Sequence, residues 1–314
     1  MVRADLVPAG GPAAGLKTST QEERTMFIKR LAALSLAVAS IVAMPALAKQ
    51  YTNQDLLVSA QDLMQGSAGQ TVLIDVRTEE DYLKGHIPGA VGIDPNAVAA
   101  PYSPIDGALK PISQIAEMFG ELGVGPDTRV VLYDDKGGFH AARMFWVLEY
   151  LGHSNVALLD GGLTAWKDED GALESGAVAR ALVRKLEPAL TPRRFASADW
   201  ILERRDEEET IVIDVRPPAL WAKGHIPWAL NIPWKGNLRA DKTMKPEAAL
   251  LAHFAAMGVT PDKDIVIHCQ NGLASAHSYF ALRLIGFPRV RTYHRSWSEW
   301  GSSDDLPTSS KTEG

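Results

Sequence analysis

Two parts of this sequence repeat each other in the same order, and this repeat constrains the fold more than any other feature. The motif D-V-R at residues 75–77 and the motif G-H-I-P at residues 85–88 return at 214–216 and 224–227 with one constant offset. Weaker matches lie upstream and downstream of both motifs, for example between residues 145–152 and 279–286. Self-similarity over such a long period indicates that one structural unit was duplicated.

Each unit alternates short apolar strands with helical patterns. Strands are predicted at residues 72–74 and 211–213, where each run ends in D-V-R, and again at 156–159 and 290–293. The aspartate and arginine of each D-V-R motif are expected to pair with each other. Alternating strands and helices favour a parallel sheet covered by helices on both faces. The predicted fold class is therefore α/β, with two similar domains in tandem.

The only cysteine, Cys269, lies where a predicted strand ends and a predicted helix begins. Ile265, Val266 and Ile267 form the strand, and the loop after Cys269 contains Gly272, which can adopt backbone angles closed to other residues. A loop above a helix N-terminus can direct its N–H groups towards an anion and favour a thiolate. Cys269 is thus a candidate nucleophile. The alternative is that it is a small buried hydrophobic residue.

The two repeats differ at this position. The first repeat has Asp134 after its strand where the second has Cys269, and an aspartate cannot act as a sulfur nucleophile. The opposite change occurs further on, where residues 160–162 (D-G-G) become 294–296 (H-R-S). The second repeat is therefore predicted to carry the chemistry, with His294 and Arg295 near its loop, and the first to be non-catalytic.

The N-terminus is typical of a secretory signal peptide. A basic start at Met26 is followed by an apolar stretch and then by Ala46-Leu47-Ala48, with small residues suited to cleavage after Ala48. A membrane anchor is the alternative. We expect the natural start to be Met26, residues 1–48 to be an extension plus signal, and the mature protein to be periplasmic, with no membrane association after cleavage.

Composition excludes several classes of function. Hydrophobic residues make up 46% of the chain and charged residues 22%, as in ordinary globular proteins. The formal net charge is −6, and residues 1–48 contain five basic and three acidic residues, so their removal makes the chain more acidic. An acidic protein is a poor candidate for binding nucleic acid. The histidines and the single cysteine follow no metal-binding spacing, so no metal and no cofactor are expected.

The sequence resembles the tandem-domain rhodaneses, which are thiosulfate and 3-mercaptopyruvate sulfurtransferases. The resemblance is carried by the paired D-V-R and G-H-I-P motifs, by D-G-G at 160–162, by C-Q-N-G at 269–272 and by S-W-S-E-W-G at 296–301. It implies two rhodanese-like domains. We place the first at residues 51–170, an interdomain linker at 171–194 and the catalytic domain at 195–308.

The resemblance also implies a mechanism. Cys269 would take the outer sulfur of a donor such as thiosulfate and hold it as a persulfide, which a thiol or cyanide would then remove. Backbone N–H groups of the loop would hold that persulfide. The residues concerned are Gln270, Asn271, Gly272, Leu273, Ala274 and Ser275.

Positions that carry cations in relatives are neutral in this sequence. Gln270 and Asn271 follow the cysteine, Ala274 stands two places after the loop glycine, and Leu220 stands four places after the D-V-R arginine. Our hypothesis is that Arg295, with His294, supplies the missing contact to an anionic donor. A surface arginine is the alternative.

The residues of the loop can be compared with what three other functions would require. A phosphatase would need an arginine at Ser275, and the loop has too few cations to hold phosphate. A 3-mercaptopyruvate sulfurtransferase would carry serine in place of Asn271. A non-catalytic sulfur carrier would form a persulfide on Cys269 without rapid turnover. The last two remain open as alternatives to thiosulfate sulfurtransferase.

Overall fold

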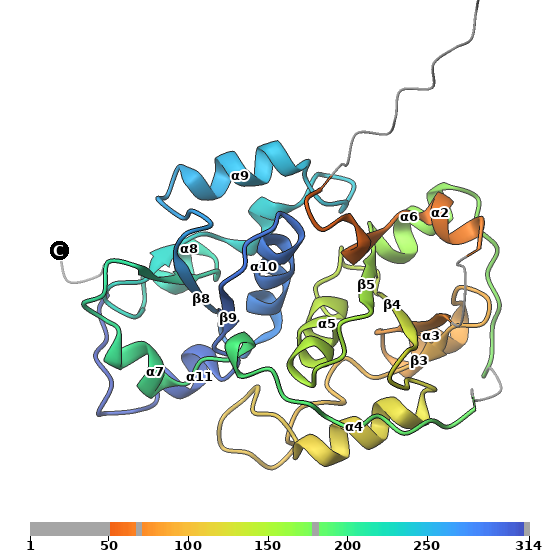
Figure 1. Cartoon of the computed structure of the whole chain (residues 1–314), viewed down its shortest axis with the longest axis horizontal. Coiled ribbons are helices and arrows are strands. Elements are labelled where there is room, and N and C mark those ends of the chain that lie inside the picture. Colours follow the sequence, from red (N-terminus) through yellow and green to blue (C-terminus); the bar gives the residue numbers. More distant parts are fainter. Residues whose placement is uncertain (1–50, 67–70, 178–181, 311–314) are drawn as a thin grey trace, which may run out of the picture. The chain divides into compact units, whose positions relative to one another are not determined.

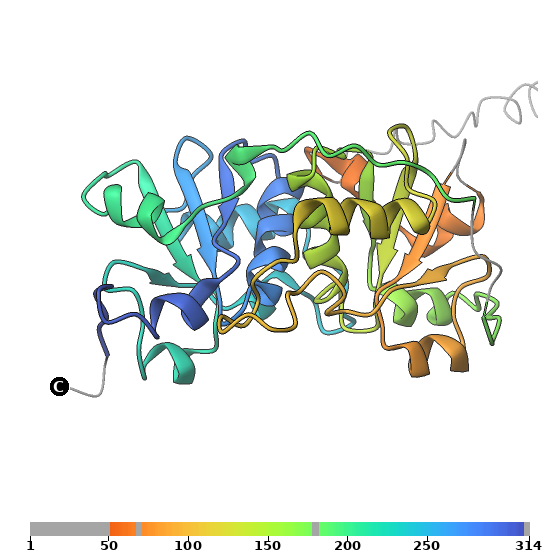
Figure 2. The same cartoon turned by 90° about the horizontal axis from the view of Figure 1, so that it is seen from below.

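The computed structural model describes residues 51–66, 71–177 and 182–310. The predicted signal peptide lies outside these ranges. Within them, the chain forms two parallel sheets, with strand orders β1-β5-β4-β2-β3 and β7-β6-β8-β9. Figures 1 and 2 show helices on both sides of each sheet. The predicted α/β class, with two similar domains in tandem, is confirmed. No helix in the described ranges is both long enough and apolar enough to cross a membrane.

The first repeat runs from a short 3₁₀ turn to the helix that closes its sheet. Its elements are η1 (Gln54–Leu56), β1 (Leu57–Val58), α2 (Ala60–Met64), β2 (Thr71–Asp75), α3 (Glu79–Lys84), β3 (Val91–Gly92), α4 (Ile112–Glu121), β4 (Arg129–Tyr133), α5 (Ala141–Tyr150), β5 (Val156–Leu159) and α6 (Gly162–Asp168).

The second repeat follows the same order. Its elements are η2 (Pro192–Arg194), α7 (Ala198–Glu203), β6 (Thr210–Asp214), α8 (Pro218–Trp221), β7 (Leu230–Asn231), η3 (Trp234–Asn237), α9 (Glu247–Ala255), β8 (Asp264–His268), α10 (Leu273–Leu284), β9 (Val290–Thr292) and α11 (Ser296–Trp300). Its counterpart of β1 is reduced to a single bridge between Phe195 and Thr292, which is why this sheet has one strand fewer.

Alternating side chains of the central strands cover both faces of each sheet. In β4, Val130 and Leu132 join one apolar cluster, whereas Val131 and Tyr133 join a second cluster under α2 and α6. Successive residues of a strand point to opposite faces, so a continuous apolar run is what a sheet covered on both sides requires.

The spacing between the two repeated motifs has a direct structural cause. The Arg77 side chain donates to the Asp75 carboxylate and also to the carbonyl oxygen of Gly85, 2.7 Å away. In the second repeat, Arg216 binds Asp214 and the carbonyl of Gly224 in the same way, at 2.6 Å. Each arginine therefore ties the end of its strand to the turn that begins G-H-I-P.

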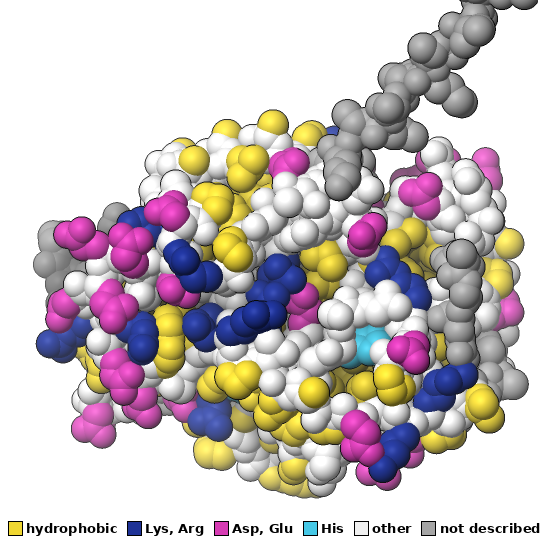
Figure 3. Space-filling model, in the orientation of Figure 1, with side chains coloured by type: hydrophobic (Ala, Val, Ile, Leu, Met, Phe, Trp, Pro, Cys, Tyr) yellow, Lys and Arg dark blue, Asp and Glu magenta, His cyan; other side chains and the backbone are white. Residues whose placement is uncertain are grey.

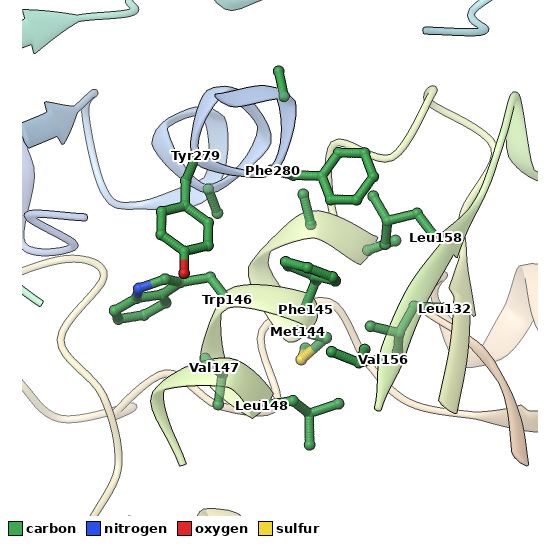
Figure 4. Packing of buried hydrophobic residues seen from close by; sticks show 14 of the residues in the cluster. Leu132, Met144, Phe145, Trp146, Val147, Leu148, Val156, Leu158, Tyr279 and Phe280 are labelled. Atoms are coloured by element: carbon green, nitrogen blue, oxygen red, sulfur yellow. The ribbon is translucent and has the colours of Figure 1, made fainter. Parts of the chain in front are cut away.

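The two repeats share one apolar core, which forms where α5 and α10 pack together. Phe145 of α5 and Phe280 of α10 meet edge to face with ring centroids 5.0 Å apart. Figure 4 shows Phe280 above Phe145, Trp146 beside Tyr279, and Leu132 and Leu158 on the side of the strands. These side chains and those around Cys269 belong to one continuous cluster. The packing of these two helices therefore sets the position of the second repeat's loop against the first repeat.

The first described residues bond to the second repeat. The hydroxyl of Tyr51 donates to the carbonyl of Lys245 at 3.1 Å, and the side chain of Asn53 donates to the carbonyl of Arg283 at 2.6 Å. The segment that we predicted to be an interdomain linker lies along the first repeat, where Glu174 forms an antiparallel bridge with His86 and Ala189 bonds to Leu151. Figure 2 shows its green trace crossing from one repeat to the other.

The surface shown in Figure 3 carries charges of both signs. Acidic and basic side chains are interspersed over the second repeat, and several basic side chains gather near the centre of this face. Between the repeats, Arg283 of α10 and Glu149 of α5 form an ion pair at 2.9 Å.

Candidate active site

Cys269 follows β8 directly and precedes α10 by three residues, as predicted. Its side chain is only 2% exposed. It is not surrounded by apolar groups alone, because the N–H of Gly272 points at its sulfur with an N–Sγ distance of 3.1 Å. The hydroxyl of Ser275 lies 3.7 Å from the same atom. The thiol therefore has two polar partners, a backbone N–H that donates to it and a hydroxyl oxygen that can accept its proton, and a purely hydrophobic cysteine needs neither.

The geometry of the loop depends on Gly272. Its φ angle is +90°, and a Cβ at this position would lie 2.3 Å from a guanidinium nitrogen of Arg143 and 2.5 Å from the carbonyl oxygen of His294. Glycine adopts positive φ without the steric cost that other residues incur. Only a glycine fits this position, and its N–H is the one that reaches the sulfur.

The loop N–H groups predicted to hold a persulfide are only partly used in the structure. The N–H of Gly272 contacts Sγ, whereas Leu273, Ala274 and Ser275 form the first turn of α10. The first N–H groups of a helix have no partner within that helix. The remaining predicted donors, Gln270 and Asn271, lie in the loop itself. The cradle of six donors remains a prediction.

Ser296 holds the cysteine from the other side, and sequence reasoning did not single it out. Its hydroxyl accepts the N–H of Cys269 at 3.0 Å and donates to the carbonyl of Tyr293 at 2.8 Å. Its φ angle is +55°, although it is not a glycine, and Gly162 occupies the same place in the first repeat with φ +58°. Strained backbone of this kind is kept where the surroundings hold it in place. The replacement of G by S in the second repeat was the available signal.

The structure brings a cation from the first repeat to the loop, and sequence reasoning did not single it out. Arg143 of α5 is 2% exposed and donates to the carbonyl oxygens of Asn271 and Gly107, both at 2.8 Å. Burial lowers the pKa of Arg143 to about 10, and attraction to Cys269 and Asp106 opposes that shift. The guanidinium therefore remains charged at neutral pH.

Two further residues of the first repeat touch the same loop. The carboxylate of Asp106 accepts the side-chain N–H of Asn271 at 2.8 Å. Gly107 lies so close to the loop that a Cβ there would be 2.1 Å from the carbonyl oxygen of Asn271. The loop after Cys269 is thus contacted by residues of both repeats.

The two predicted anion contacts, Arg295 and His294, have other partners in the structure. Arg295 pairs with Glu299 at 2.8 Å. The ring of His294 packs against Trp146 and Phe195, with centroids 5.4 and 5.5 Å apart. Burial lowers the pKa of His294 to about 3, with Arg143 and Arg295 adding to the shift, so this ring is neutral near pH 7. Contact between these residues and a donor anion remains a prediction.

The first repeat has the same loop, but its own carboxylate fills it. Asp134 follows β4 directly, as Cys269 follows β8. The last paired residues of the two central ladders are Asp75–Tyr133 and Asp214–His268, so Asp134 and Cys269 are each the next residue after an equivalent pair. The carboxylate of Asp134 accepts four backbone N–H groups at 2.7 to 3.1 Å. They belong to Lys136, Gly138, His140 and Ala141. This loop therefore demonstrates that the fold directs several amides at one negatively charged group.

Taken together, the second repeat's loop holds a thiol that faces a backbone N–H, a hydroxyl and a nearby buried guanidinium. These groups stabilise negative charge on sulfur, which favours nucleophilic attack by a thiolate and retention of a sulfur anion. The arrangement suits a reaction in which a sulfur atom with a negative charge is bound and then transferred.

Comparison with protein families identifies the repeats. The family model described as a rhodanese-like domain matches the chain twice, over residues 59–169 and 197–303. The thiosulfate sulfurtransferase of Azotobacter vinelandii is 35% identical over 266 residues, which are 82% of this chain and 98% of that protein. The 3-mercaptopyruvate sulfurtransferase of Escherichia coli K12 is also 35% identical, over 257 residues, with coverage of 78% and 90%.

Two further similarities extend this picture. The sulfur carrier protein TtuD of Thermus thermophilus is 34% identical over 281 residues, covering 82% of this chain and 97% of that protein. Among solved structures, the anaerobic ergothioneine biosynthesis enzyme of Chlorobium limicola superposes with a TM-score of 0.76 at 22% identity, covering 82% and 71% of the two chains. At that identity the superposition shows a common fold.

Proposed function

Since this chain belongs to the rhodanese-like family of sulfurtransferases, we propose that it moves a sulfane sulfur from thiosulfate to a thiol or cyanide through a persulfide on Cys269. The relatives named above include both thiosulfate and 3-mercaptopyruvate sulfurtransferases at equal identity, so membership of the family supports the reaction type. The choice of thiosulfate is the finer part of the proposal.

The first step forms one bond and breaks one. The Cys269 thiolate attacks the outer sulfur of thiosulfate, a new S–S bond forms, and sulfite leaves with the electron pair of the old S–S bond. The outer sulfur keeps its negative charge in the persulfide, and the charge that began on Sγ leaves with the sulfite dianion. In the second step a thiolate or cyanide attacks that outer sulfur, and the Cys269 thiolate leaves.

The observation that carries this proposal is the N–H of Gly272 directed at Sγ from 3.1 Å. A backbone N–H of the loop reaches the sulfur directly, and the first turn of α10 offers further N–H groups beside it. Fixed donors stabilise the thiolate, the charge in transfer and the persulfide without reorganising.

The test is turnover of residues 49–314 with thiosulfate and cyanide, with Cys269→Ser as the matched control. Because Cys269 is the only cysteine in the sequence, the mass of the intact protein after thiosulfate should rise by one sulfur atom in the natural chain and remain unchanged in the variant. Equal turnover by Cys269→Ser would contradict the mechanism.

A sulfur carrier is the second candidate, and one observation favours it. Arg295, the cation nearest to the loop within the second repeat's own motif, is paired with Glu299, and the loop side chains Gln270 and Asn271 are neutral. A dianionic donor such as thiosulfate would then meet less positive charge at this loop than at a loop with free cationic side chains. A carrier would show the persulfide on Cys269 together with negligible turnover of thiosulfate and cyanide, and turnover of 3-mercaptopyruvate would identify the other branch.

We also propose that this reaction takes place in the periplasm. The proposal rests on the signal-like sequence between Met26 and Ala48, with its apolar stretch and its small residues before the cleavage site. Fractionation of cells that express the natural gene, with N-terminal sequencing of the product, tests it. A product that keeps Met26 and stays in the cytoplasm would contradict it.

A further inference from the structure

Arg143 is a buried cation without a buried anion. Its side chain is 2% exposed, and its two hydrogen-bond acceptors are the neutral carbonyl oxygens of Asn271 and Gly107. Among the described residues, no carboxylate lies within ion-pair distance of it. A buried charge that is not paired is costly, so a protein that keeps one has a use for it. Three of its five N–H donors have no acceptor in the described part of the chain.

Its position places that charge next to the reacting sulfur. One bond of Arg143 is made to Asn271, two residues after Cys269, and the same nitrogen would lie 2.3 Å from a Cβ on Gly272. No side chain separates the guanidinium from the loop, because Gly272 and Gly107 both lack one. Attraction to Cys269 is among the causes that keep the pKa of Arg143 from falling further.

The other charged or titratable groups that face this site supply no positive charge in place of Arg143. His294 packs beside Arg143 and is neutral, and burial also lowers the pKa of His268, which lies 3.7 Å from Asp214. Asp106 adds negative charge at the loop through its bond to Asn271.

We propose that Arg143 is the counter-ion of the sulfur anion at Cys269, supplied to the catalytic loop by the first repeat. The inference rests on the proposed function and adds a residue to it. It accounts for a loop whose own side chains are neutral, since the positive charge comes from α5. The first repeat then contributes to the reaction itself, and Arg143 acts on the thiolate and on the persulfide alike.

Two substitutions separate charge from hydrogen bonding. Arg143→Lys keeps the charge but loses the planar fork that binds two carbonyls at once, whereas Arg143→Gln keeps N–H donors and loses the charge. The readout is the ultraviolet absorbance of the Cys269 thiolate as a function of pH, with Cys269→Ser subtracted as background. This measurement uses no sulfur donor, so it can fail or succeed independently of the proposed function.

We expect the thiolate of Arg143→Gln to appear at a pH about one unit higher than in the natural chain. The curve of Arg143→Lys should stay close to that of the natural chain. Single-turnover persulfide formation should follow the same order.

A purely structural role predicts the reverse, with Arg143→Lys impaired at least as much as Arg143→Gln. That result, in variants whose urea unfolding shows them to be folded, would overturn the proposal. If Arg143→Gln does not fold, Arg143→Lys decides alone. A folded lysine variant whose thiolate curve has moved to higher pH, with slow persulfide formation, would also overturn it.

Discussion

The guanidinium of Arg143 donates a hydrogen bond to the carbonyl oxygen of Asn271 across 128 residues of sequence, at 2.8 Å. One repeat therefore holds the loop on which the other repeat carries its cysteine. In the same loop, the hydroxyl of Ser296 accepts the N–H of Cys269, and the N–H of Gly272 points at the sulfur. These contacts can be changed one at a time.

Replacing Gly272 by alanine should abolish persulfide formation and destabilise the protein. The new Cβ would overlap Arg143 and the carbonyl of His294 in a backbone conformation with φ +90°. Gly258→Ala is the matched control, since Gly258 has φ +75° but nothing within 4 Å of the added Cβ. The control isolates the strain of positive φ, about 1–2 kcal/mol. Urea unfolding and mass spectrometry measure both variants, and equal behaviour would contradict the predicted overlap.

Ser296→Ala should lower the free energy of unfolding more than Ser296→Gly. Both remove the hydroxyl that accepts the N–H of Cys269, a loss of about 1–3 kcal/mol for a buried donor left unsatisfied. Alanine also retains the conformational strain of a φ angle of +55°, whereas glycine adopts this angle without strain. Gly162, with φ +58°, occupies the equivalent position in the first repeat. A glycine variant less stable than the alanine variant would contradict the assignment of strain.

Asp134→Ala should destabilise the first repeat by roughly 3 kcal/mol or more, because four backbone N–H groups lose the carboxylate that accepts them. Asp135→Ala, at the neighbouring half-buried position, should change stability by about 0.5 kcal/mol at most. Urea unfolding compares the two. Similar costs would mean that the Asp134 carboxylate is not what holds its loop.

His277 should make the protein less stable in acid. Its Nε2 lies 3.0 Å from the carbonyl oxygen of Gly137, and burial lowers its pKa from 6.5 to about 4. Above pH 6.5 the ring is neutral in both states. Between pH 6.5 and 4 only the unfolded chain takes the proton, so stability falls as the pH falls, by up to about 3 kcal/mol.

The measurement is the free energy of unfolding from pH 7 to pH 4 for the natural chain and for His277→Gln. Glutamine keeps a donor near Gly137 but does not titrate, so the variant should lose less stability over this range. Parallel curves for the two proteins would show that His277 is not the group responsible.

Arg295→Ala should raise the KM for thiosulfate if Arg295 contacts the donor, while kcat changes little. In the structure Arg295 is paired with Glu299, so Glu299→Gln should free its guanidinium and lower the KM. Steady-state kinetics of both variants test this contact. Unchanged KM values in both would remove Arg295 from the site.

The local features of the site could be predicted from sequence because they depend on residues close together in the chain. Ile265, Val266 and Ile267 are apolar and β-branched, so the strand before Cys269 was evident, and Gly272 marked the turn into the helix. The parallel direction of the strands could be predicted from the alternation of strands and helices, whereas the order of the strands in each sheet was not predicted.

The cation of the site could not be predicted in the same way. The role of Arg143 depends on how α5 packs against α10, through contacts such as that between Phe145 and Phe280. A signal was present nonetheless, because Arg143 is the one charged residue in the apolar run at 141–148. A charge inside a buried stretch of helix indicates that some group elsewhere in the fold requires it.

The bonds from Tyr51 and Asn53 to the second repeat set an order of events during folding. They join residues 194 and 230 positions apart, so they cannot form until almost the whole polypeptide has been made. Contacts between such distant residues carry the largest cost of loop closure and are fixed late. The beginning of the described chain is therefore expected to pack among the last segments during folding. A bulky group fused immediately before Tyr51 would disturb these bonds to the second repeat.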